Sequence, residues 1–276
     1  MISVGIVRKI VKTLRKKEFI PIQHTTDVTG MLEDKVALII GGSGGIGKAI
    51  AKSFSESGCK VIICGTRQQK LEKCLSSFEN KDNVRTMIFN VANPETFEER
   101  IDEATSFWGK IDILVNSAGV HTENVDFFDM KPEEFDRVMN IDLKGAFFVC
   151  QAIGKYMIDN NIKGSILNIS SSRGSEPAWS PYGLSKWGLK GLTMGVGKIF
   201  SPYGINVNAI APGSTATSLL GIEDGDSINS NENYMGRLIM PDEVASLAKL
   251  IVSDVGKMID GEVIHIAAGR GTFEFR

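Results

Sequence analysis

The sequence predicts an α/β fold: one doubly wound parallel sheet of seven strands, with helices on both faces. Short apolar runs rich in Val, Ile and Leu alternate with longer segments whose apolar residues recur at helical spacing. Most of the short runs are continuously apolar, which is typical of strands that helices cover on both sides. No internal repeat or low-complexity linker interrupts this order, so we expect a single domain, residues 31–276, with a short N-terminal extension.

Each predicted strand is a short β-rich run, and the segment after it leaves room for a connection back across the sheet. The predicted strands are 36–40, 60–64, 85–89, 111–116, 164–169, 205–210 and 262–266.

Residues 1–30 differ from the rest of the chain. They carry six Lys and Arg residues against Glu18 and Asp27, and Val7, Ile10 and Leu14 recur at helical spacing among the basic residues. This pattern predicts a basic amphipathic helix. We expect it to pack on its own subunit or a neighbour, and the alternative is a weak contact with a membrane surface or a partner.

Composition excludes several classes of protein. With 42% hydrophobic and 23% charged residues, the chain is typical of a globular protein. A formal net charge of -2 gives no overall attraction to nucleic acid. The four cysteines form no C-x-x-C pair and no apolar run is long enough to span a membrane, so we expect a cytoplasmic protein with reduced thiols and no metal site.

A glycine-rich turn joins the first predicted strand to a helical segment. Glycines in such a turn allow tight backbone geometry, and the following helix N-terminus stabilises the charge of a pyrophosphate. The residues expected to bind the cofactor here are Gly41, Ser43, Gly44, Gly45, Ile46 and Gly47. The strand before the turn and the helix after it favour a dinucleotide site over a flexible loop.

Tyr182 is the one tyrosine with a lysine four residues later, at Lys186. A helix that begins near Tyr182 places both side chains on one face. The lysine ammonium would favour loss of the phenol proton, as required of a proton donor or acceptor in carbonyl chemistry. This spacing is weak evidence by itself, because a surface pair would look the same.

In this order, the motifs resemble those of the short-chain dehydrogenase/reductase family, over residues 31–269. The turn has the family's spacing, although Ile40 stands where the family often has Thr. The resemblance implies a Rossmann fold and a catalytic set of Asn140, Ser171, Tyr182 and Lys186. Ser170 and Ser172 stay as alternatives to Ser171, and Asp142 is expected to be solvated.

The resemblance also implies further cofactor contacts at the ends of later strands. Asn90 and Val91 would lie near the adenine, and Asn116 would brace the sheet beside the nucleotide. The remaining expected contacts are Ala118, Gly119, Tyr182, Lys186, Pro212, Gly213, Thr215 and Thr217.

The end of the second strand predicts the type of nucleotide. No acid stands there to accept a bond from a ribose hydroxyl, and Thr66 and Arg67 could hold a 2′-phosphate. NADP(H) is therefore favoured over NAD(H).

The segment 217–238 is polar and glycine-rich, which is typical of a mobile lid. We therefore expect an oxidoreductase that interconverts a carbonyl and an alcohol on a small polar, sugar- or polyol-like substrate. A reductase of 3-oxoacyl thioesters shares every motif and is the alternative, and a non-catalytic nucleotide-binding scaffold is a third hypothesis. The resemblance further implies a homodimer or homotetramer.

Overall fold

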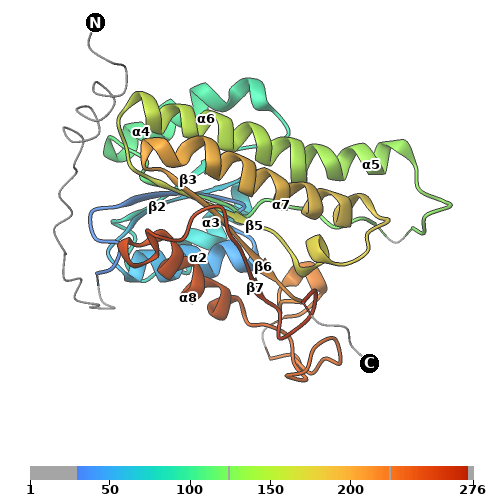
Figure 1. The fold of residues 1–276 in the computed structure, drawn as a ribbon. Coiled ribbons are helices and arrows are strands. Elements are labelled where there is room, and N and C mark those ends of the chain that lie inside the picture. The colour runs from blue at the N-terminus through green and yellow to red at the C-terminus, as the bar shows by residue number, and fades with distance from the viewer. Residues whose placement is uncertain (1–29, 124, 224, 273–276) are drawn as a thin grey trace, which may run out of the picture.

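The computed structural model describes residues 30–123, 125–223 and 225–272 of the 276-residue chain. Within these ranges seven strands form one sheet in the order β3-β2-β1-β4-β5-β6-β7, and every neighbouring pair is parallel. Helices cover both faces of the sheet (Figure 1), which confirms the predicted doubly wound fold. The helix predicted within residues 1–30 lies outside the described ranges, apart from Gly30.

The strands begin and end close to their predicted bounds. β1 spans Val36–Ile40 as predicted, and β6 continues to Pro212, which still pairs with Ile266. Proline is tolerated at this position because the ladder ends there. The other strands are β2 (Lys60–Gly65), β3 (Val84–Ile88), β4 (Ile113–Asn116), β5 (Ser165–Ile169) and β7 (Val263–Ile266).

The helices form two layers (Figure 1). One layer contains α2 (Gly45–Glu56), α3 (Gln68–Ser76) and α8 (Pro241–Val252). The other contains α4 (Phe97–Trp108), α6 (Ala146–Asp159) and α7 (Pro181–Phe200), with α5 (Pro132–Met139) leading into α6.

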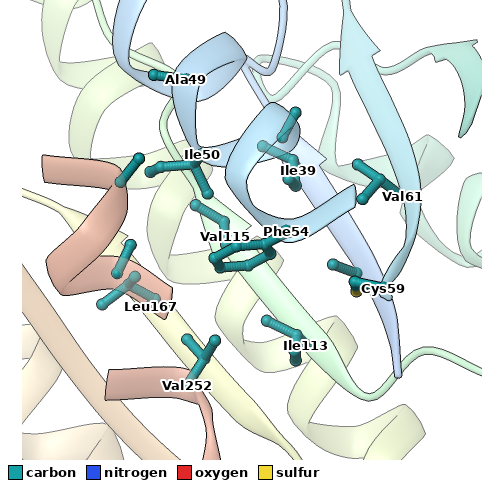
Figure 2. Close-up of a cluster of buried hydrophobic side chains, with 14 of the residues drawn as sticks. Ile39, Ala49, Ile50, Phe54, Cys59, Val61, Ile113, Val115, Leu167 and Val252 are labelled. Carbon is teal, nitrogen blue, oxygen red and sulfur yellow. The ribbon is translucent and has the colours of Figure 1, made fainter. Parts of the chain in front are cut away.

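Each strand faces both layers because successive side chains point to opposite sides. Ile39 of β1 belongs to the cluster beneath α2 and α8, whereas Leu38 and Ile40 belong to the cluster beneath α4 and α6. Figure 2 shows the first cluster, in which the fully buried ring of Phe54 lies among side chains of the sheet and α8. Burial on both faces explains why the strand sequences are continuously apolar.

The strand order reverses between β1 and β4, since β2 and β3 lie on one side of β1 and the later strands lie on the other. In such sheets, ligands bind beyond the carboxyl ends of the strands at this point of reversal. Among the residues that the structure describes, no helix has the length and apolarity needed to cross a membrane.

Candidate active site

The glycine-rich turn lies directly beyond β1. Gly41 has a φ of +73°, and a Cβ atom on it would lie 2.6 Å from the carbonyl oxygen of Ser117. A Cβ atom on Gly47 would lie 2.4 Å from the carbonyl oxygen of Gly41. Glycine is therefore needed at both positions, and its absence of side chain lets the turn fold back against the segment after β4.

The turn leads into the N-terminus of α2. Gly44, the N-cap residue, provides no side-chain cap, and the first turn of the helix contains no acidic residue. The first N–H groups of α2 thus have no side-chain acceptor of their own, and the positive end of the helix dipole favours an anion. These features fit the pyrophosphate of a dinucleotide.

A cavity of about 510 Å³ runs from this turn along the carboxyl ends of the strands. Lys70 lines it beside Thr66 and Arg67, and none of the described side chains that line it is acidic. The predicted cofactor residues that line it are Gly41, Ser43, Gly44, Gly45, Ile46, Gly47, Thr66, Arg67, Asn90, Val91, Ala118, Gly119, Tyr182, Lys186 and Thr217.

Four predicted cofactor residues do not line this cavity. Pro212, Gly213 and Thr215 line a second cavity beside it. Asn116 is 3% exposed, and its amide donates to Asn168 Oδ1 at 3.4 Å across the sheet. This position fits the bracing role that was expected of Asn116.

Tyr182 and Lys186 lie one turn apart near the start of α7. Ser180 caps the helix by accepting the Gly183 N–H at 3.2 Å, and Pro181 occupies the first turn, where its missing N–H costs nothing. Lys186 Nζ lies 5.3 Å from the Tyr182 ring centroid. The loop after β4 supports the tyrosine, since Thr122 Oγ1 accepts its backbone N–H at 3.2 Å and the His121 ring centroid lies 4.5 Å from the phenol ring.

The second cavity has a volume of about 460 Å³ and meets the first at Tyr182. The residues that line both are Ile46, His121, Ser170, Tyr182, Thr217 and Leu219. Two ligands, one in each cavity, would therefore face each other beside the phenol. This is the arrangement that transfer between a dinucleotide and a substrate requires.

The serines after β5 line the second cavity, with Ser170, Ser171 and Ser172 all contributing. Ser171 Oγ accepts the Arg173 N–H at 3.2 Å, so its hydroxyl proton is free to donate. Ser170 Oγ is buried without a hydrogen-bond partner among the described groups, and Ser170 alone of the three reaches both cavities. Ser171 and Ser170 therefore both remain candidates for the substrate-oxygen donor.

Asn140 does not join this cluster: its side chain is exposed and lines neither cavity. A π-helical segment, Asn140–Gly145, interrupts the helix here and turns Asp142 inward. The expectation that Asp142 is solvated was wrong. Asp142 is 1% exposed, and its Oδ2 lies 3.0 Å from Lys186 Nζ.

Asp142 is held from two sides. Its Oδ1 accepts the Val120 N–H at 2.8 Å, while Lys186 faces Oδ2. Burial by itself lowers the pKa of Lys186, but the Asp142 charge and the phenol of Tyr182 raise it, and the net pKa lies above its ordinary value. Lys186 is therefore an ammonium at neutral pH.

The pKa of His121 is shifted in the opposite direction, below its ordinary value. Burial lowers its pKa and is the largest cause, Asp142 raises the pKa by less, and the charges of Lys186 and Arg173 lower it further. A neutral imidazole consequently stands beside Tyr182 at neutral pH.

Sequence reasoning missed several residues of the site, among them Lys70, Thr122, Asp142 and Arg270. Lys70 could have been found, because it lies one helical turn after Arg67. Asp142 and Arg270 meet their partners only through the tertiary fold, so no local pattern marks them.

Comparisons with known proteins agree with this geometry. The family model described as short chain dehydrogenase matches residues 35–225. A 3-oxoacyl-[acyl-carrier-protein] reductase of Thermotoga maritima is 34% identical over 86% of this chain and 98% of its own length. One from Rickettsia felis is 37% identical over 88% of this chain and 98% of its own.

Solved structures have the same fold. A short chain dehydrogenase from Bacillus anthracis superposes with a TM-score of 0.79 and 30% identity, covering 88% of this chain and 98% of that one. The family match, the similarity over nearly whole relatives and the two cavities that meet at Tyr182 lead to one conclusion. The chain belongs to the short-chain dehydrogenase/reductase family and is an NAD(P)-dependent oxidoreductase.

Proposed function

We propose that the chain reduces a ketone with NADPH and that Tyr182 supplies the proton to the substrate oxygen. The observation that carries this proposal is the meeting of the two cavities at Tyr182, above the buried Lys186 ammonium. The dihydronicotinamide would supply the hydride. The alkoxide that forms needs a proton at once, and the phenol lies where both ligands meet.

The neighbouring side chains support this role by position. Lys186 is fixed by Asp142 and places a positive charge beside the phenol ring. The hydroxyl of Ser171 or of Ser170 would donate to the substrate oxygen and stabilise charge that develops there. Asp142 replaces Asn140 as the third polar group of the cluster.

NADPH is favoured over NADH by the far end of the first cavity. Arg67, Lys70 and Thr66 lie where the second strand ends, and Ser43 lies across from Gly65. Two cations and two hydroxyls suit a 2′-phosphate, whereas a ribose hydroxyl would find no carboxylate among the described residues that line this cavity.

A 3-oxoacyl thioester is the substrate that the comparisons support best. Relatives in Thermotoga maritima and Rickettsia felis, each matched over 98% of its length, carry the name 3-oxoacyl-[acyl-carrier-protein] reductase. A solved structure named as such a reductase, from Brucella melitensis, superposes with a TM-score of 0.78 at 26% identity, covering 93% of this chain and 100% of that one. This evidence favours the thioester over the sugar- or polyol-like substrate expected from the polar lid.

A small polar ketone remains a second candidate because the wall of the substrate cavity is charged. Arg173, Glu232 and Arg270 line it together with the serines after β5. Charged groups in a cavity wall favour a ligand with polar groups of its own, since they can bind such groups, whereas an acyl chain makes only apolar contacts.

Steady-state reduction of a substrate panel tests the proposal. The panel pairs short 3-oxoacyl thioesters with hydroxylated ketones of similar size, each with NADPH and with NADH. Turnover of any member with NADPH supports ketone reduction, and the ratio of kcat/KM values between the two groups ranks the candidates. NADPH binding without turnover of any ketone would contradict the proposal.

A further inference from the structure

Four charged side chains, Arg173, Glu176, Glu232 and Arg270, form a cluster that we call the Arg270 cluster. They come from the loop after β5, the segment 217–238 before α8, and the turn after β7. Arg173, Glu232 and Arg270 line the substrate cavity. The Arg270 side chain is only 14% exposed, so its charge forms part of the cavity wall.

Glu176 fixes the orientation of Arg270. Its Oε1 accepts from Arg270 Nε at 2.9 Å, and its Oε2 accepts from Arg173 at 2.9 Å. The Glu176 side chain is 18% exposed, whereas that of Arg173 is 52% exposed. The Glu176 carboxylate therefore accepts hydrogen bonds from two guanidinium groups. Arg270 has further N–H donors that can bind a second anion.

That second anion in the structure is a carboxylate of the chain itself. Arg270 Nη1 donates to Ser214 Oγ at 2.8 Å and also to Glu232 Oε2. Ser214 Oγ donates to the same oxygen of Glu232. A guanidinium and a hydroxyl thus converge on one carboxylate oxygen beside the substrate cavity.

Glu232 is the more exposed of the two carboxylates in the cluster. Its side chain is 52% exposed, and it belongs to the polar segment between β6 and α8, of which Leu219 and Leu220 also line the cavity. With Glu232 in place the charges of the cluster cancel. If Glu232 moved away, one positive charge of a largely buried arginine would lack a counter-ion, and the site would favour a replacement anion.

We propose that Arg270 and Ser214 form a subsite for a carboxylate of the substrate, which Glu232 occupies until the substrate binds. This inference rests on the proposed ketone reduction and specifies its second candidate, the small polar ketone, as an oxo acid. The ketone carbon would accept the hydride from NADPH and the ketone oxygen would accept the Tyr182 proton. The products are a hydroxy acid and NADP+, and the substrate carboxylate stays unchanged on Arg270.

The first test compares straight-chain oxo acids, in which the ketone is moved stepwise away from the carboxylate, with their primary amides. We expect the wild-type enzyme to prefer at least one acid over its amide by about tenfold to a hundredfold in kcat/KM, as one charge-assisted hydrogen bond implies. Arg270→Gln should lower the kcat/KM for the acids more than that for the amides, so that the preference for the acid is lost.

Glu232→Gln is the more specific variant, because it removes the competing carboxylate and leaves Arg270 and Glu176 in place. The KM for the preferred oxo acid should fall by about tenfold, and by more than the KM for its amide. Glu223→Gln is the matched control: it removes an exposed carboxylate from the same segment, and both KM values should be unchanged.

Calorimetric titration of the NADP+ complex with the same acids and amides measures the subsite independently of turnover. Tighter binding of the acid, strengthened by Glu232→Gln, supports it even if Arg270→Gln does not fold. Equal binding of acid and amide, or equal effects of Glu232→Gln and Glu223→Gln, would overturn it. If the enzyme reduces neutral ketones or thioesters with no preference for acids, the subsite fails and ketone reduction stands; if no ketone is reduced, the proposed function itself fails.

Discussion

The ion pair between Asp142 and Lys186 is the residue-level feature that most alters the expected site. Both side chains are buried, with exposed fractions of 0% and 4%, and the pair replaces the amide that Asn140 was expected to provide. A buried lysine with no counter-ion loses its proton readily, so the carboxylate maintains the charge beside Tyr182. The pair thus links the π-helical segment to α7, beside the proposed proton donor Tyr182.

Replacing Asp142 with Asn should change the pH dependence of reduction. The titratable groups that face Lys186 are Asp142 from the π-helical segment, Tyr182 from its own helix and His121 from the loop after β4. Asp142 raises the pKa of Lys186, so its removal lets burial lower that pKa. The ammonium is then lost at lower pH, and the alkaline limb of the kcat profile should move to lower pH.

Asp136→Asn provides the control, since Asp136 is an exposed carboxylate on α5, the helix that leads into the same segment. Its profile should coincide with that of the wild-type enzyme. An unchanged profile in a folded Asp142→Asn variant that binds NADPH would show that Asp142 is only a packing group.

At the scale of elements, the proposed preference for NADPH depends on the carboxyl end of β2 and the start of α3. Arg67 is the N-cap residue of α3 and Lys70 lies in its first turn, so both cations border the same end of the first cavity. The helix thereby places two positive charges where a 2′-phosphate would lie.

Arg67→Ala should raise the KM for NADPH by about tenfold to a hundredfold, because a charge-assisted bond to phosphate is lost. The KM for NADH should change little. Lys73→Ala removes a basic residue of the same helix that does not line the cavity, and should leave both values unaltered. A parallel loss for NADH and NADPH in Arg67→Ala would contradict the preference.

The elements themselves were largely predictable, because their causes are local. Val36–Ile40 is a run of five apolar residues followed by glycine, and both faces of such a run must be buried. The turn at Gly41 and the pair Tyr182 and Lys186 were readable from spacing. The inward turn of Asp142 was not, because residue spacing does not reveal a π-helical segment, and this segment determines which side chain faces Lys186.

The substrate cavity was the least predictable part of the site, because the residues around it are brought together only by the tertiary fold. Glu176, Ser214, Glu232 and Arg270 come from different connections of the sheet, and their hydrogen bonds exist only once the strands are aligned. The composition of 217–238 indicated a polar segment. It did not indicate that Glu232 would pair with Arg270 beside the substrate cavity.

At the scale of the whole molecule, large apolar side chains are exposed on the layer formed by α6 and α7. Phe147 is 45% exposed, Leu184 40% and Met194 55%, and α7 lies along this face of the sheet (Figure 1). Exposed apolar side chains that gather on neighbouring helices favour an interface. They support the expected homodimer or homotetramer.

Phe147→Glu combined with Met194→Glu should therefore reduce the molar mass measured by light scattering to that of a smaller species, because charges would be buried at the interface. Met258→Glu is the control, since Met258 is 96% exposed in the connection between α8 and β7. Wild-type protein that is monomeric at micromolar concentration would contradict the expectation directly.

Single-turnover reduction of the best panel substrate, compared between the wild-type enzyme and Tyr182→Phe, tests whether Tyr182 supplies the proton to the substrate oxygen. The phenylalanine keeps the ring beside His121 and Lys186 but removes the proton. We predict unchanged NADPH binding and a rate of reduction lower by about a hundredfold to ten-thousandfold, the contribution of a general acid. A Tyr182→Phe variant that reduces the ketone within a few-fold of the wild-type rate would contradict it.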